Sequence, residues 1–128
     1  MTAEANILVL GVEGDLASEL AGALAGLKHN VVFEFDTAPG DFPARLRSTA
    51  ADLVFCGHKP EVLEAMLVAA GHVRPGLPVV VVSDKAEVPA WLDALEAGAA
   101  DYCAAPFESA HLGWILECLI TRVHVASA

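Results

Sequence analysis

The chain has 128 residues, 55% of them hydrophobic and 19% charged, and its formal net charge is −10. This length and composition indicate a compact domain with a core of its own and exclude a disordered chain. The acidic balance argues against nucleic-acid binding, and no apolar run reaches the roughly 20 residues that span a bilayer. Three cysteines in apolar stretches cannot all pair, which indicates a reducing cytoplasm. We therefore expect a single domain over residues 1–128, with its core at 6–124, that contacts neither nucleic acid nor membrane.

Short apolar segments alternate with helical patterns from the start of the chain. Residues 6–10 (NILVL) predict a strand that is buried on both faces. Residues 14–27 predict a helix with leucines along one face, and a second strand is expected at 31–35. Asp41 is expected to cap a short helix that runs to about Thr49. The first part of the chain therefore predicts two strand–helix units.

The rest of the chain continues the same alternation. Three further strands are expected at 52–56, 78–82 and 100–104. Helices are expected at 60–71, 88–97 and 108–124. Gly71 and Gly98 are expected to end the first two of these helices, because glycine readily closes a helix in the left-handed conformation. Five such units with short connections predict a parallel sheet with helices on both faces.

The turn after the first strand allows a nucleotide-binding interpretation. Gly11 and Gly14 follow a strand and open a helix, and Asp36 lies just after the second strand, as in dinucleotide-binding folds. Glycine at such a turn often serves only the backbone. Glu13 and Asp15 also place negative charge where a pyrophosphate would lie. A small nucleotide-binding α/β domain is therefore the alternative function from a different class.

Three segments of the chain resemble a known family. The stretches LPVVVVSD (77–84), ALEAGAADYCAAPF (94–107) and ADLVF (51–55) are similar to the response-regulator receiver domain, the CheY-like phosphoacceptor module of two-component signalling. The resemblance covers nearly the whole chain. It implies an α/β, doubly wound, flavodoxin-like (βα)5 fold whose five parallel strands lie in the order 2-1-3-4-5. It also implies a role in phosphorelay signal transduction and a cis peptide bond before Pro106.

The chain departs from this family at the residues that perform its chemistry. Receivers carry two acidic residues after the first strand, a phosphoacceptor Asp at the end of the third, and a Lys before the proline that precedes the last helix. Here Gly11 and Val12 take the first two places, Cys56 or Gly57 the third, and Ala105 the fourth. These side chains supply no nucleophile, no Mg²⁺ ligand and no cation. The hypothesis is a degenerate pseudo-receiver that has no enzymatic activity, binds no metal or cofactor, and does not depend on phosphorylation.

Other polar residues leave two interpretations open. Ser83 matches the family's hydroxyl switch residue and Tyr102 its switch aromatic. They serve either as an ordinary loop hydrogen bond and a packing aromatic, or as a residual switch for another ligand. Cys56, near His58 and Lys59, is a candidate redox sensor, because a reactive thiol needs an electropositive setting. A receiver variant that senses a ligand or redox state is therefore a second alternative.

The tryptophans bear on the choice of partner surface. Trp114 lies opposite the apolar stripe of the helix at 108–124, so we expect it to be exposed and to mark a contact surface. Trp91 lies at the edge of the apolar stripe formed by Val88, Leu92 and Leu95 and is expected in the core. Receivers bind partners through the surface formed by their fourth helix, fifth strand and last helix. The resemblance therefore implies a protein partner or a homodimer on the face formed by 88–97, 100–104 and 108–124.

Overall fold

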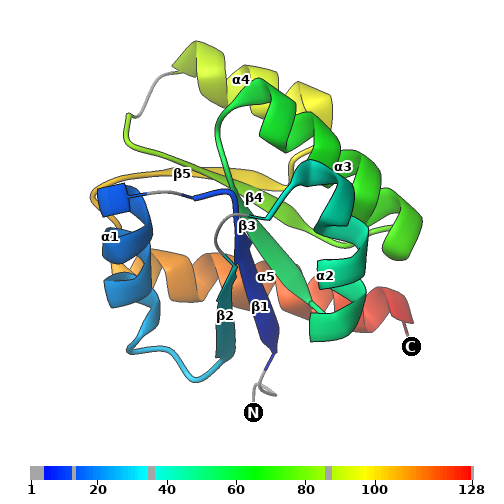
Figure 1. The fold of residues 1–128 in the computed structure, drawn as a ribbon. Coiled ribbons are helices and arrows are strands. Elements are labelled where there is room, and N and C mark those ends of the chain that lie inside the picture. The colour runs from blue at the N-terminus through cyan, green and yellow to red at the C-terminus, as the bar shows by residue number, and fades with distance from the viewer. Residues whose placement is uncertain (1–4, 13, 35–36, 86–87, 128) are drawn as a thin grey trace.

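Five parallel strands form one sheet in the computed structural model, which describes residues 5–12, 14–34, 37–85 and 88–127 (Figure 1). The strands are β1 (Asn6–Leu10), β2 (Asn30–Glu34), β3 (Leu53–Gly57), β4 (Val79–Ser83) and β5 (Asp101–Ala104). They lie in the order β2-β1-β3-β4-β5, and each neighbouring pair is parallel. The predicted doubly wound, flavodoxin-like topology is therefore confirmed.

Helices cover both faces of this sheet. They are α1 (Gly14–Leu24), α2 (Phe42–Thr49), α3 (Pro60–Val73), α4 (Val88–Ala97) and α5 (Ser109–Ser127), with a 3₁₀ turn at Pro39–Asp41. Figure 1 shows α1 and α5 on one face and α2, α3 and α4 on the other. Each face has its own apolar cluster, because successive side chains of a strand point to opposite faces. None of the described helices combines the length and apolar character needed to cross a bilayer.

Several element boundaries differ from those predicted. α1 ends at Leu24 rather than at residue 27, because the chain tightens there into a turn in which the Leu27 N–H donates to the Leu24 carbonyl. α3 continues through Gly71 to Val73. A glycine inside a helix costs only about 1 kcal/mol relative to alanine. The burial of Ala69 and Ala70 on the preceding turn offsets that cost, so Gly71 does not end the helix.

The other boundaries lie close to their predicted places. β3 and β4 are each displaced by one residue, β5 begins one residue late, and β2 begins one residue early. α5 begins one residue late and runs three residues beyond its predicted end. Asp41 does precede α2, but its side chain makes no capping hydrogen bond with the described residues. The 3₁₀ turn before α2 accounts for this, because it leaves Asp41 with φ −95° and ψ −3° rather than the extended backbone of a capping residue.

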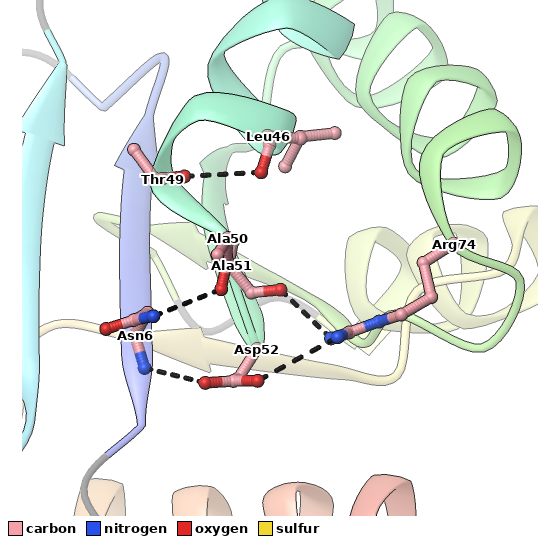
Figure 2. A network of polar contacts seen from close by, with 7 residues as sticks. All are labelled: Asn6, Leu46, Thr49, Ala50, Ala51, Asp52 and Arg74. Carbon is pink, nitrogen blue, oxygen red and sulfur yellow. Dashed lines mark hydrogen bonds and ion pairs between the residues drawn. The ribbon is translucent and has the colours of Figure 1, made fainter. Parts of the chain in front are cut away.

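A polar network joins the amino ends of β1 and β3 (Figure 2). The Asn6 N–H donates to the Asp52 carboxylate at 2.8 Å, and the Asn6 side chain donates to the Ala50 carbonyl at 3.2 Å. Arg74, just after α3, donates to the Ala51 carbonyl at 2.9 Å and forms a longer ion pair with Asp52 at 3.8 Å. The network holds together the segments that lead into β1 and β3 and out of α3. In sheets of this kind, ligands bind at the opposite edge, beyond the carboxyl ends of the strands.

Candidate functional site

A small pocket lies at the carboxyl ends of β1 and β3. The strand order reverses at this point, because β2 lies on one side of β1 and β3 lies on the other. Doubly wound sheets bind ligands at such a crossover. The pocket has a volume of about 320 Å³ and is lined by Gly11, Val12, Asp15, Leu16, Gly57, His58, Lys59 and Asp84. The structure thus brings together six residues that the sequence pointed to, at positions 11, 12, 15, 57, 58 and 59.

The backbones of Gly11 and Gly57 meet in this pocket. A Cβ atom on Gly57 would overlap the carbonyl oxygen of Gly11. Gly11 itself has φ +73°, and a Cβ atom there would lie 2.7 Å from Cγ1 of Val62. Gly57 therefore requires glycine for close packing, and Gly11 requires it for both its left-handed backbone and its packing against Val62. Asp36, the third residue of the nucleotide-binding hypothesis, lies outside the described residues, so that alternative gains no support here.

The structure separates the roles of Cys56 and Gly57. Cys56 is fully buried and belongs to the apolar cluster that also holds Leu63 and Met66. Burial raises the pKa of its thiol from 9.0 to about 12. The thiol is therefore protonated at neutral pH, which removes the thiolate that redox sensing requires. Gly57, one residue on, lines the pocket instead.

We expect only Cys118 of the three cysteines to react readily with iodoacetamide in the native protein at pH 8. Cys118 is exposed, whereas burial, and then the negative charge of Asp101, raises the pKa of Cys103 to about 12. Intact-mass analysis should show one adduct in native buffer and three in urea, with peptide mapping to locate them. Rapid native labelling of Cys56 would contradict its assignment as an inert core residue.

Two carboxylates, from Asp15 and Asp84, lie on the described wall of the pocket. In the described part of the chain, no group of three or more His, Cys, Asp or Glu side chains is arranged to hold a metal ion. Asp15 lies in the first turn of α1, where its negative charge interacts favourably with the positive end of the helix dipole. Asp84 follows β4 and is the second carboxylate on the pocket wall. Glu13, which the sequence places near Asp15, lies outside the described residues.

Ser83 and Tyr102 converge on one loop residue. The Ser83 hydroxyl oxygen accepts a hydrogen bond from the Lys85 N–H at 3.2 Å and is almost fully buried. The Tyr102 hydroxyl donates to the Lys85 carbonyl at 2.9 Å. Ala105 donates its N–H to the Ser83 carbonyl at 2.9 Å, and the bond from Ala105 to Pro106 is cis, as predicted. The Ser83 and Tyr102 side chains thus both bond to the backbone of Lys85, in the loop after β4.

The two tryptophans are both exposed. Trp114 on α5 is 62% exposed, which confirms the predicted position opposite the core stripe. Trp91 on α4 is 42% exposed, so its predicted place in the core is wrong. The reason is the rotation of α4: Ala94 is buried against the sheet, while Leu92, which the predicted stripe contained, is 50% exposed. The apolar stripe therefore predicted the wrong inner face for α4, because this helix packs on the sheet through alanine.

Comparisons with solved structures identify receiver domains as neighbours of this fold. NtrX from Brucella abortus in complex with ADP superposes with a TM-score of 0.81 at 27% identity, over 98% of this chain and 28% of that chain. The receiver domain of NtrX alone gives a TM-score of 0.73 at 28% identity, over 90% and 98% of the two chains. A CheY-like protein, TadZ from Pseudomonas aeruginosa, shares the fold with a TM-score of 0.73 at 24% identity, over 91% and 99%.

Sequence comparisons add nothing to these structural neighbours. No protein-family profile matches the chain, and no curated protein matches it. The chain spans 28% of the length of the longer NtrX chains that it matches. The isolated receiver domain of NtrX, by contrast, is matched over 98% of its length. The similarity to NtrX therefore extends over its receiver domain. Its neighbours are response-regulator receiver domains, modules of two-component signalling.

Proposed function

We propose that this chain is a degenerate receiver domain that signals by binding a partner protein and does not use phosphorylation. The observation that carries the proposal is that Gly11, Val12 and Gly57 line the carboxyl-end pocket. The resemblance to receivers leads one to expect acidic residues at these places. The proposal includes one receiver-like unit without catalytic activity, working in a reducing cytoplasm where its thiols stay free.

The chemistry of phosphoryl transfer supports this proposal. A receiver needs a carboxylate nucleophile, oxygen ligands for Mg²⁺ and a cation that balances the charge on the transferred group. Gly57 offers no side chain as nucleophile, and Ala105 offers no ammonium group. Asp15 and Asp84 are the carboxylates on the described pocket wall, and they come from a helix start and a loop rather than from the end of β3. In this proposal they do not replace the phosphoacceptor.

We expect no phosphoryl adduct when the protein is incubated with acetyl phosphate and Mg²⁺. Intact-mass analysis measures this, with a receiver that carries Asp at the end of its third strand as the positive control. A stoichiometric, hydroxylamine-labile adduct would overturn the proposal, since that lability marks an acyl phosphate. Variants Asp15→Asn and Asp84→Asn would then identify which carboxylate had accepted the group.

The partner surface in this proposal is the face of α4, β5 and α5. Each of its two helices carries an exposed large apolar side chain, Trp91 on α4 and Trp114 on α5. Tryptophan is enriched at the centres of protein interfaces, where its large ring loses contact with water. The part played by Trp114 is tested by the substitution described in the Discussion.

A further inference from the structure

A second and larger cavity lies between α3 and α4. It has a volume of about 870 Å³, and its floor is made by Val81 of β4 and Tyr102 of β5. The α3 wall carries Pro60, Leu63, Glu64, Leu67 and Val68, and the α4 wall carries Ala90, Asp93, Ala94 and Ala97. Both walls follow the three- and four-residue spacing of a helix face. The cavity is therefore a groove that runs along the two helices.

The groove exists because α4 presents alanines to α3. Ala90, Ala94 and Ala97 end at Cβ and leave the space between the helices unfilled. Opposite them, Val68 is 57% exposed although it is a large apolar side chain. From Ala90 to Ala97 a helix rises about 10 Å, or roughly two turns. The groove thus offers an apolar strip about two helical turns long.

The rim of the groove is acidic. Glu64 lies on the α3 wall and Asp93 on the α4 wall, and Asp84, just after β4, also lines the groove; all three are exposed. Lys85 and His58 are the basic side chains that line it. This excess of negative charge agrees with the net charge of −10 for the whole chain. An occupant with apolar side chains between basic ones would match both the floor and the rim.

We propose that the groove between α3 and α4 binds an amphipathic helix of a partner protein, one whose apolar stripe is flanked by lysine or arginine. A helix in a groove inserts apolar side chains at positions i, i+3 or i+4, and i+7, which is the length of the alanine strip. This inference goes beyond the proposed function. The groove shares α4 and Tyr102 of β5 with the surface proposed above, but its other wall is α3, and it includes neither Trp91 nor Trp114.

The probe for this proposal is a synthetic helical peptide about four turns long, with leucines at that spacing and lysines flanking them. Backbone amide shifts of the ¹⁵N-labelled protein locate its binding, and a titration gives the Kd. A peptide of the same leucine pattern with glutamates in place of lysines tests the charge, and a scrambled lysine peptide tests the stripe. We expect the largest shifts at the groove residues. We also expect the lysine-flanked helix to bind at least tenfold more tightly than either control peptide.

Two pairs of variants match a change in the groove with the same change outside it. Asp93→Lys reverses a rim charge, while Glu96→Lys reverses an exposed charge on the same helix that does not line the groove. Ala97→Met fills the groove, while Ala110→Met adds the same side chain to exposed α5. We expect each groove variant to weaken binding about tenfold and each control to leave it within about twofold.

Several results would overturn the proposal. One is equal binding of the lysine, glutamate and scrambled peptides, since the groove would then not distinguish charge or pattern. Others are shifts centred away from α3 and α4, no binding of the lysine peptide, or equal effects of Asp93→Lys and Glu96→Lys. Trp114→Glu should leave peptide binding unchanged. The groove can therefore fail while the proposed function stands, and the reverse also holds.

Discussion

Replacing Gly57 by aspartate, which puts a carboxylate at the end of β3, is expected to destabilise the protein by roughly 3 kcal/mol. The new Cβ atom would overlap the carbonyl oxygen of Gly11, which is backbone and cannot rotate away. Gly11 is itself fixed by its φ of +73° and by the side chain of Val62. The variant should also gain no phosphoryl adduct, because Val12 and Ala105 still supply neither a metal ligand nor a cation.

Two alanine variants separate the steric effect from the charge. Gly57→Ala adds the same Cβ atom without a carboxylate and should account for most of the loss in the free energy of unfolding. Gly22→Ala is the matched control: Gly22 lies inside α1, and a Cβ atom there meets nothing within 4 Å. It should stabilise the protein by about 0.5–1 kcal/mol. Urea denaturation measures all three, and a Gly57→Ala variant as stable as the wild type would contradict the close approach.

The topology was predictable because β1, β3 and β4 carry apolar runs that are buried on both faces of the sheet. Residues such as Val80 and Val82 point to one helical layer, and Val79 and Val81 to the other, so both faces of β4 had to be covered. Such runs, separated by helical patterns, leave few arrangements other than a doubly wound parallel sheet. Local signals were less reliable for boundaries. Gly71 has the residue type of a helix end, yet packing extends α3 past it.

The candidate pocket was only partly predictable from the sequence. The sequence left Cys56 and Gly57 as alternatives, because a shortened loop allows either alignment with the phosphoacceptor. The alternation of side chains along β3 separates them, since Cys56 points into the core and Gly57 ends the strand at the pocket. The contact of Gly11 with Gly57 joins two segments distant in the sequence, and composition gives no sign of it.

The groove beside α4 shows a second limit of pattern analysis. Apolar periodicity on α4 selected Leu92 as an inner residue, because alanine contributes little to a hydrophobic stripe. In the structure Ala94 faces the sheet, and Leu92 and Trp91 face outward. Alanines at 90, 94 and 97 were the available signal, since small residues on one helix face mark a close approach or an unfilled space. The position of α3, which the sequence does not give, decides whether such a face is closely packed or leaves a groove.

Replacing Trp114 by glutamate is expected to weaken self-association or partner binding about tenfold, or about 1.4 kcal/mol, while the fold stays intact. The side chain is 62% exposed and lies opposite the face that carries Leu112, Ile115 and Leu116, so the core of α5 is untouched. Covering a large apolar side chain contributes roughly 1.5–3 kcal/mol, and a glutamate at the same place would have to lose its hydration.

Val32→Glu provides the control for Trp114→Glu. Val32 is 39% exposed on β2, which lies at the edge of the sheet opposite β5, so it tests a general effect of added charge. Sedimentation equilibrium of the two variants and the wild type measures self-association, and a pull-down compares the partners each retains. If Trp114→Glu and Val32→Glu behave alike, the face of α4, β5 and α5 is not the working surface. If only Trp114→Glu loses binding, α5 contributes directly to that surface, because the unchanged binding of Val32→Glu excludes a general effect of the added charge.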